Sequence, residues 1–308
     1  MSMSDTMLRG CGTALVTPFL DDGSVDEEAF RSLVAWQIEE GVDFLVPCGS
    51  TGEAATMDVD EHVRVVALCA EVAAGRVPVV AGAGSNDTAR AVSLSQAVCD
   101  AGATHLLHVS PMYNKPPQRG LLAHFRAVAD ASPRPIVLYN VPGRTASDME
   151  AETTLALAEH PNIVGVKEAA GSVARVADIL AARPRGFSVL SGDDALTLPF
   201  MSMGADGVVS VVSNAVPRIM ADLARAASAG DFETARRLHF RILPLMKAAF
   251  VESNPIPIKA ALAELGRGRD IVRLPLVPLA ETHRRRIRDA LDATAEPATG
   301  QARLSTVR

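Results

Sequence analysis

The sequence predicts an α/β protein built as a closed (β/α)8 barrel, or TIM barrel, with a C-terminal helical appendage. Eight short apolar runs, rich in Val, Ile and Leu, alternate with longer segments of helical periodicity up to about residue 214. Each run is apolar at successive positions, which is typical of parallel strands that helices cover on both faces. Eight strand and helix units in succession match a closed barrel.

The chain supports this prediction element by element. The first strand is expected at residues 12–16, and Ser24 with Glu27 forms a capping box that opens a helix through about residue 40. The remaining strands are expected at residues 43–48, 77–82, 104–109, 135–139, 163–166, 187–190 and 207–211. The helices between them are expected at residues 60–74, 88–101, 120–131, 150–159, 173–182 and 195–203.

No strand pattern follows residue 214, and four helical segments take its place. They lie at residues 221–229, 232–251, 257–265 and 279–294. We therefore expect a barrel that carries the active site at residues 1–225 and a helical region at residues 226–294. Residues 295–308 are polar and lack periodicity, so they are predicted to be a disordered tail.

The alternative to a closed barrel is an open, doubly wound sheet. That fold usually has a G-x-G-x-x-G motif after its first strand, whereas the first strand here ends in TPFLDDG. Gly82 and Gly84 follow the third strand, but the third glycine of the motif is missing. A tight turn between strand and helix explains this pair better than a phosphate-binding loop does.

The composition excludes several classes of partner. The net charge is −6 and both signs are mixed along the chain, which gives no basic stripe for nucleic acid and no polybasic patch for a membrane. The N-terminus has neither a secretory signal nor an apolar run of membrane length. The four cysteines are dispersed without a C-x-x-C pair, which argues against a disulfide framework and against a zinc site. We expect a cytoplasmic protein that binds small molecules.

Lys167 ends the predicted strand at residues 163–166 and is the central candidate residue. An ordinary amine with a pKa of about 10.4 is only about 0.1% neutral at pH 7. Burial at a strand end favours the neutral amine, which is a nucleophile toward ketones. The competing interpretation is that Lys167 turns outward and pairs with Glu168 or another carboxylate.

Other polar residues are expected at the same face, because chemistry in such barrels lies at the C-terminal ends of the strands. Ser50 and Thr51 lie in a glycine-flanked loop after the second strand, where backbone N–H groups suit a small carboxylate. Tyr113, Tyr139 and Arg144 follow the fourth and fifth strands. A neutral lysine, phenols that relay protons and a guanidinium for a second carboxylate together indicate Schiff-base chemistry on a keto acid.

These residues lie in the strings GSTGEAATM, PMYNKP, YNVPGRT, VGVKEA, LSGDDALTLPFM and NPIPIKAAL, in this order. In this respect the chain resembles the dihydrodipicolinate synthase family, among the pyruvate-dependent Schiff-base aldolases that include N-acetylneuraminate lyase. The resemblance runs from about Arg9 to about Ala293.

The resemblance implies a role for each matching residue. Lys167 matches the imine-forming lysine, and Tyr139, Ser50 and Tyr113 match the hydroxyl relay, in which the family has Thr where Ser50 stands. Thr51 matches the pyruvate carboxylate site and Arg144 the residue that receives the carboxylate of aspartate semialdehyde. The further substrate-binding positions are Gly49, Gly192 and Val209.

The implied activity is condensation of pyruvate with aspartate semialdehyde in lysine and diaminopimelate biosynthesis. It needs no metal or organic cofactor, because the imine on Lys167 is the electron sink. The family also implies a homodimer or homotetramer in which Tyr113 reaches the neighbouring active site. Two alternatives stay open: a lyase of N-acetylneuraminate or a keto-deoxy sugar acid, and a non-catalytic homologue that binds keto acids.

Feedback inhibition by lysine is not expected. Relatives that lysine inhibits bind it in a cleft whose matching positions here are Ala54, Ala55, Val59, His62, Asn86, Arg90 and Met112. Those relatives have a serine, a histidine and a carboxylate where this chain has Ala54, Val59 and Arg90. Two polar partners are therefore lost, and a cation replaces an anion.

Overall fold

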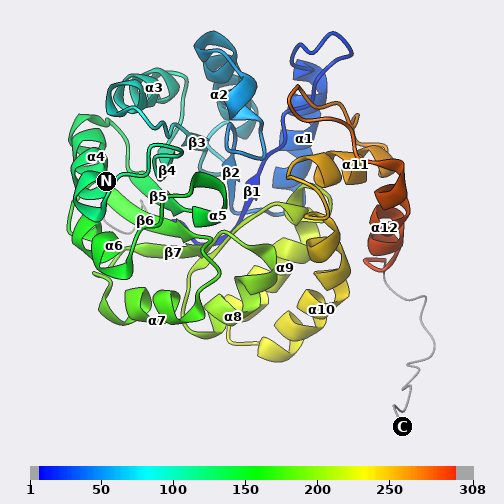
Figure 1. Ribbon diagram of the computed structural model, residues 1–308. Helices are drawn as coiled ribbons and strands as arrows, with labels where there is room; N and C mark the ends of the chain where they lie inside the picture. Colours follow the sequence, from blue (N-terminus) through cyan, green and yellow to red (C-terminus); the bar gives the residue numbers. More distant parts are fainter. Residues whose placement is uncertain (1–6, 296–308) are drawn as a thin grey trace.

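A computed structural model describes residues 7–295 of the chain and shows a closed ring of eight parallel strands (Figure 1). The strands are β1 (Gly10–Ala14), β2 (Phe44–Val46), β3 (Val80–Gly82), β4 (His105–Val109), β5 (Ile136–Asn140), β6 (Ile163–Glu168), β7 (Ser188–Ser191) and β8 (Gly207–Ser210). Their order in the sheet is β2-β1-β8-β7-β6-β5-β4-β3. A parallel bridge between Leu45 and Val79 joins the two ends. The predicted (β/α)8 barrel is thus confirmed.

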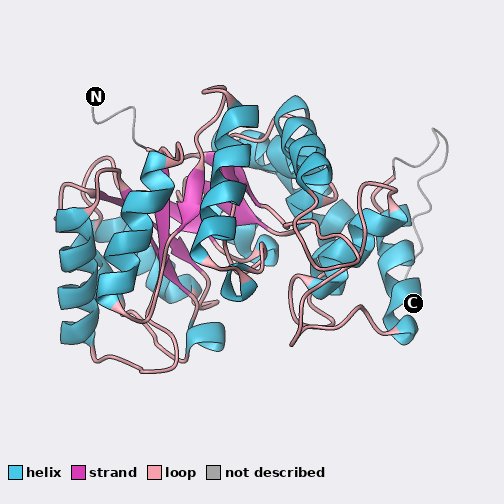
Figure 2. Cartoon of the chain, turned by 90° about the horizontal axis from the view of Figure 1, so that it is seen from above, coloured by secondary structure: helices cyan, strands magenta, loops and turns pink. Residues whose placement is uncertain are grey.

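The strands alternate with helices, as the periodicity predicts. The helices are α1 (Glu27–Glu39), α2 (Val59–Ala73), α3 (Thr88–Asp100), α4 (Gln118–Ala131), α5 (Pro142–Thr145), α6 (Ala151–Ala158), α7 (Val173–Ala182), α8 (Thr197–Ser202), α9 (Pro217–Ser228), α10 (Phe232–Ala248), α11 (Ile256–Glu264) and α12 (Glu281–Asp292). Short 3-10 turns lie at Ala54–Thr56, Asp194–Leu196 and Val212–Asn214. In Figure 2, helices surround the magenta strands, and the C-terminal helices lie beside the barrel.

Two local predictions are wrong. The cap of α1 is Asp26, whose carboxylate accepts a hydrogen bond from the N–H of Ala29, whereas the hydroxyl of Ser24 donates to Asp22. A carboxylate one residue before the helix is in reach of its free N–H groups, so the capping box is not used. The helix predicted at residues 195–203 is divided into a 3-10 turn that Asp193 caps and the shorter α8.

The core has two layers, because alternate residues of each strand face opposite sides. On β5, Ile136 and Leu138 pack against the surrounding helices, whereas Val137 and Tyr139 point into the barrel. The interior also contains Val46, Val80, Leu107, Leu190 and Val209, all buried. The barrel is thus filled with side chains, and polar groups gather at the ends of the strands.

The C-terminal helices continue from the barrel without a break. Helix α9 packs on β1 and β8 as the last barrel helix, and it also contacts α10. The predicted boundary near residue 225 falls inside α9 and stays a prediction. The tail predicted at residues 295–308 lies outside the described residues except for Ala295. No helix within residues 7–295 has both the length and the apolar character that crossing a membrane requires.

Candidate active site

Lys167 and Tyr139 lie side by side near the C-terminal ends of adjacent strands. The two residues are paired in register between β5 and β6. The Lys167 Nζ is 4.0 Å from the centroid of the Tyr139 ring. The side chains are only 5% and 8% exposed, respectively. The structure therefore brings together the predicted nucleophile and one predicted proton donor inside the barrel.

The environment of Lys167 favours its neutral form. Burial lowers the pKa of its amine, the carboxylate of Asp194 opposes this change, and the Arg144 guanidinium adds a smaller decrease, so that the pKa is about 7. At such a pKa about half of the amine is neutral at pH 7. No carboxylate among the described residues forms an ion pair with Lys167. The alternative interpretation, an outward lysine paired with Glu168, is wrong.

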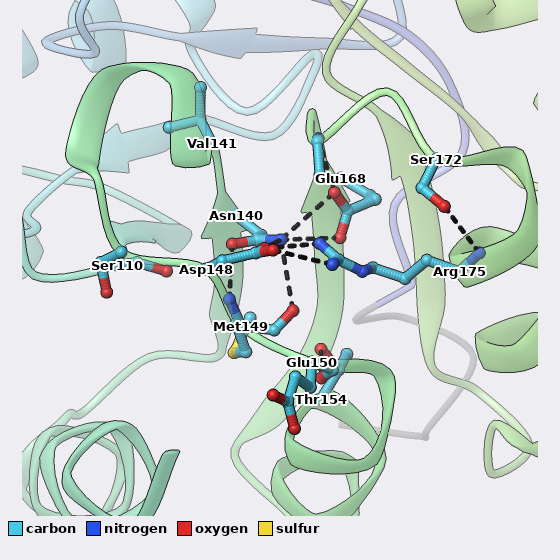
Figure 3. Close-up of polar contacts among 12 residues, drawn as sticks. Ser110, Asn140, Val141, Asp148, Met149, Glu150, Thr154, Glu168, Ser172 and Arg175 are labelled. Atoms are coloured by element: carbon cyan, nitrogen blue, oxygen red, sulfur yellow. Dashed lines mark hydrogen bonds and ion pairs between the residues drawn. The ribbon is translucent and has the colours of Figure 1, made fainter. Parts of the chain in front are cut away.

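Glu168 faces the helices instead, because the next residue of a strand points to the opposite side. Its carboxylate accepts hydrogen bonds from Asn140 Nδ2, at 3.3 Å and 3.2 Å, and from the N–H of Ala170 at 2.7 Å. Burial raises the pKa of the Glu168 carboxyl, and these hydrogen bonds oppose the rise. Figure 3 shows Glu168 turned toward Asn140.

Asn140 links this carboxylate to the segment that follows α5. Its Nδ2 also donates to Asp148 Oδ1 at 3.0 Å, and its Oδ1 accepts from the N–H of Met149 at 3.0 Å. Arg175 of α7 holds Asp148 through two hydrogen bonds of 2.5 Å and 2.8 Å (Figure 3). Asn140 directly follows Tyr139, and Glu168 directly follows Lys167. The hydrogen bonds of Asn140 and Glu168 therefore hold in place the strand ends that carry the two reacting residues. Sequence reasoning missed this network; its only signal was that a polar residue follows each of the two candidates.

Gly192 provides the space that Lys167 occupies. A Cβ atom at this position would lie 3.1 Å from both Cε and Cγ of Lys167 and 2.7 Å from Cβ of Ala169. Any larger residue would therefore push the lysine out of position. Val209 belongs to the interior wall of the barrel, where it is 2% exposed and pairs in register with Gly12. These contacts connect both predicted binding positions with the interior of the barrel.

The loop after β2 places its two hydroxyl residues differently. Thr51 is buried, and its Oγ1 accepts a hydrogen bond of 2.8 Å from Nδ2 of Asn254. Ser50 is exposed, and Gly49 has no atom within 4 Å of the position where a Cβ would stand. Within the described part of the chain, no hydrogen bond joins Ser50 to either tyrosine. The predicted relay among Ser50, Tyr113 and Tyr139 is therefore not assembled in the single chain.

Tyr113 is a highly exposed residue of the predicted site. Its side chain is 88% exposed, and its backbone has a left-handed φ of 74°. The N–H of Tyr113 donates to the carbonyl of Thr145 at 3.1 Å. This conformation costs on the order of 1 kcal/mol for a residue other than glycine. An exposed aromatic ring on a strained and anchored backbone is available to a second molecule.

Arg144 lies on the short helix α5 at the mouth of the barrel. Its Nη2 donates to the carbonyl oxygen of Asn254 at 3.2 Å, and the rest of the exposed guanidinium stays available to an anion. Its charge lowers the pKa of both Lys167 and Tyr139, which places it in the electrostatic range of the reacting groups. For Tyr139 burial outweighs this effect and raises the pKa to about 12, so its phenol stays protonated at neutral pH.

Three further residues shape the site. Asp194 is buried, accepts hydrogen bonds from the N–H groups of Val211 and Val212, and has its pKa raised to about 6 by burial. Asn254 contacts both Thr51 and Arg144, as described above. Lys259 forms a buried ion pair with Glu53. Among residues 7–295, no three His, Cys, Asp or Glu side chains come together as a metal ion would require.

Comparison with known proteins shows the family of this chain. The model of the dihydrodipicolinate synthetase family matches residues 7–294. A relative from Koribacter versatilis, named 4-hydroxy-tetrahydrodipicolinate synthase, is 54% identical over 91% of this chain and 94% of its own length.

Two solved structures are similar throughout. One is the chloride-inhibited dihydrodipicolinate synthase from Acinetobacter baumannii in complex with pyruvate, with a TM-score of 0.91 and 44% identity over 93% of this chain and 98% of that one. The other is the enzyme from Cyanidioschyzon merolae with lysine bound, with a TM-score of 0.90 and 42% identity over 93% and 98% of the two chains. The chain therefore belongs to the dihydrodipicolinate synthetase family.

Proposed function

We propose that this protein is a lyase that condenses pyruvate with L-aspartate 4-semialdehyde to 4-hydroxy-tetrahydrodipicolinate, in lysine and diaminopimelate biosynthesis. The observation that carries the proposal is the buried amine of Lys167, with a pKa of about 7, held 4.0 Å from the ring of Tyr139. Burying a lysine without an ion-pair partner costs desolvation free energy, and a role as the imine-forming nucleophile explains why such a residue is present. The relatives' shared name points to the same reaction.

The chemistry begins with the neutral amine of Lys167. Nζ attacks the keto carbon of pyruvate, and loss of water from the adduct gives the imine. The protonated phenol of Tyr139 is placed to supply the proton that the departing hydroxide needs. The resulting phenolate of Tyr139 takes a proton from the carbon next to the imine, the electrons of that C–H bond move into the imine, and the enamine carbon attacks the aldehyde. The amino group of the aldehyde substrate then replaces Nζ at the imine carbon, which closes the ring and frees Lys167. The imine itself accepts the electrons, so the proposed reaction uses no metal and no organic cofactor.

The two carboxylates of the substrates have separate partners in this proposal. Thr51 with the backbone of the Gly49 loop binds the carboxylate of pyruvate. Arg144 binds the carboxylate of the aldehyde, which a bidentate contact stabilises by about 1.5 to 3 kcal/mol. Gly192 and Val209 border the space next to Lys167. Both substrates are small metabolites, which fits the proposed cytoplasmic location, and neither a membrane nor a nucleic acid takes part.

A direct assay tests the assignment. Purified protein should convert pyruvate and aspartate semialdehyde with a kcat/KM well above that for N-acetylneuraminate or keto-deoxy sugar acids. Those sugar acids are cleaved through the same lysine imine. The comparison therefore measures the preference for a substrate, since the imine chemistry is common to all of them. A higher kcat/KM for a sugar acid would refute the synthase assignment, and imine formation without turnover of any aldehyde would favour a non-catalytic homologue.

We also propose a homodimer, or a homotetramer made of two dimers, in which Tyr113 enters the site of the neighbouring subunit and completes the relay with Ser50 and Tyr139. The support is its 88% exposure on a strained, anchored backbone. Mixing inactive Tyr113→Phe subunits with inactive Lys167→Met subunits should restore activity, because one site of each mixed dimer then contains both intact residues. A mixture that stays as inactive as its two components would contradict the sharing of Tyr113.

Lysine at millimolar concentration is expected not to inhibit the enzyme. Val59 is 60% exposed at the start of α2, and the side chain of Arg90 is 83% exposed, with its Nε 3.7 Å from Oδ2 of Asp87. A like charge near 4 Å costs about 1 kcal/mol in water, and the missing carboxylate removes an attraction of similar size. Inhibition should appear in the triple variant Ala54→Ser, Val59→His and Arg90→Glu. Half-inhibition of the unaltered enzyme below about 1 mM lysine would contradict this prediction.

A further inference from the structure

A segment of the C-terminal region reaches the active site through Asn254. This residue lies just before α11, and its side chain is 94% buried, since only 6% is exposed. Its Nδ2 donates to Thr51 Oγ1 at 2.8 Å, and its backbone carbonyl accepts from Arg144 Nη2 at 3.2 Å. One residue thus contacts the two groups that the proposed function assigns to the two substrate carboxylates.

The same segment is anchored to the loop that carries Thr51. Lys259, one turn into α11, forms a buried ion pair with Glu53 and donates to the carbonyl of Ile271 at 2.8 Å. The N–H of Arg273 donates to the second oxygen of Glu53 at 3.0 Å. Glu53 lies two residues after Thr51, and Lys259 lies five residues after Asn254. The ion pair between them therefore fixes the position of Asn254 relative to Thr51. Such an arrangement sets the geometry of a hydrogen bond before a ligand arrives.

The direction of this hydrogen bond decides what Thr51 is able to do. A hydroxyl group has one hydrogen to donate, and its oxygen accepts through two lone pairs. An amide N–H that donates to Thr51 Oγ1 occupies one lone pair and leaves the hydroxyl hydrogen free. A keto-acid carboxylate only accepts, so it needs that hydrogen. We propose that Asn254 is a positioning residue that orients the hydroxyl of Thr51 as a donor to the carboxylate of the keto acid.

The other oxygen atom of Asn254 fits this role. Among the described residues nothing donates to its buried Oδ1, so the side chain is held in place by the Thr51 contact rather than by a network of its own. This inference deepens the proposed function, because it rests on pyruvate as the first substrate.

The first test compares the KM values of the two substrates in Asn254→Asp and Asn254→Ala. A carboxylate at this position only accepts, so Asp takes the hydrogen of Thr51 and repels an anion. We expect the KM for pyruvate to rise at least about tenfold in Asn254→Asp and less in Asn254→Ala, which is the range of a hydrogen bond to a charged group. The KM for the aldehyde should stay within about threefold in Asn254→Ala, because this variant adds no charge and keeps the backbone carbonyl that contacts Arg144.

The second test is a double-variant cycle with Thr51→Val, which removes the hydroxyl. If Asn254 acts through that hydroxyl, Asn254→Ala should change the KM for pyruvate by less than about twofold in the Thr51→Val background. Ser253→Ala, an exposed neighbour, is the control and should leave both KM values unchanged. Equal rises in both KM values, full additivity with Thr51→Val, or an unchanged KM for pyruvate in Asn254→Asp would each overturn the inference.

Trapping with borohydride separates this inference from the proposed function. Pyruvate with borohydride should inactivate the unaltered enzyme, and Asn254→Asp should need at least about tenfold more pyruvate for the same rate. If the unaltered enzyme shows no pyruvate-dependent inactivation, the proposed function fails. If it is inactivated and Asn254→Asp shows the same dependence on pyruvate, only the role of Asn254 fails.

Discussion

Replacing Lys167 with methionine is expected to lower kcat by about 10⁴-fold or more, the scale seen when a covalent nucleophile is removed. Methionine has a similar length and no charge, so it should fill the space beside Gly192 and Tyr139 without unfolding the barrel. The loss should therefore come from the missing amine. Activity should be measured together with thermal unfolding, which should be unchanged or shifted upward because a desolvated cation has been removed.

Covalent trapping identifies the amine that reacts. Borohydride with pyruvate should place an adduct on Lys167 of the unaltered enzyme and none on the Lys167→Met variant, as peptide mass spectrometry will show. Lys247→Met, at an exposed lysine, is the matched control and should react like the unaltered enzyme. An adduct that maps to Lys115, Lys247 or Lys259, the other lysines of the chain, would contradict the assignment.

The pH dependence of the same reaction reports the environment of the amine. Only the neutral amine attacks, and its pKa of about 7 means that deprotonation is half complete near pH 7. The trapping rate at limiting pyruvate should thus rise with pH through about 7 and level off above about 8. An ordinary lysine would give a rate that still rises at pH 9 to 10.

Most of the fold could be predicted from local sequence patterns, because each strand and helix has its own periodicity. Parallel strands buried on both faces leave unbroken apolar runs, and β4, β6 and β8 lie where those runs predict them. Element ends were less certain, because several polar groups compete for the first N–H groups of a helix. At α1 the cap is Asp26 rather than Ser24, because Asp26 directly precedes the helix and lies two residues closer to it than Ser24.

In the candidate site, local patterns predict some of the residues, whereas contacts between distant segments could not be predicted. Alternation along β5 and β6 is local, so Lys167 and Tyr139 could be placed at one face from sequence, and the structure brings them together. The outward direction of Glu168 follows from the same alternation once its neighbour is known to point inward. In contrast, Asn254 contacts Thr51 from 203 positions away, and no pattern within either segment indicates this pairing. Side-chain pairs across such separations depend on the packing of whole elements.

Lys259 is the clearest case of a residue whose importance only the packing reveals. Its helix α11 has apolar residues on all sides, a pattern that gives no sign of a buried charge. The amine and the carboxylate of Glu53 are each 1% exposed in the ion pair, and Lys259 also lies 4.1 Å from the centre of the Phe19 ring. Burial lowers the pKa of the Lys259 amine to about 8, whereas Glu53 opposes this change. The pair thus joins the C-terminal helices to the loop of the active site at considerable cost in desolvation.

Lys259→Met is expected to destabilise the protein by about 3 kcal/mol or more, because it leaves the Glu53 carboxylate buried without its cation. For a chain of this size such a loss should lower the thermal midpoint by on the order of 10 °C. Lys247→Met, the exposed control, should change stability by no more than about 0.5 kcal/mol. Adding Glu53→Gln to Lys259→Met should recover part of the loss, since the uncompensated charge is then gone while the amide still accepts from the N–H of Arg273. Equal midpoints for Lys259→Met and Lys247→Met, or a double variant less stable than Lys259→Met alone, would show that the buried pair does not hold the two regions together.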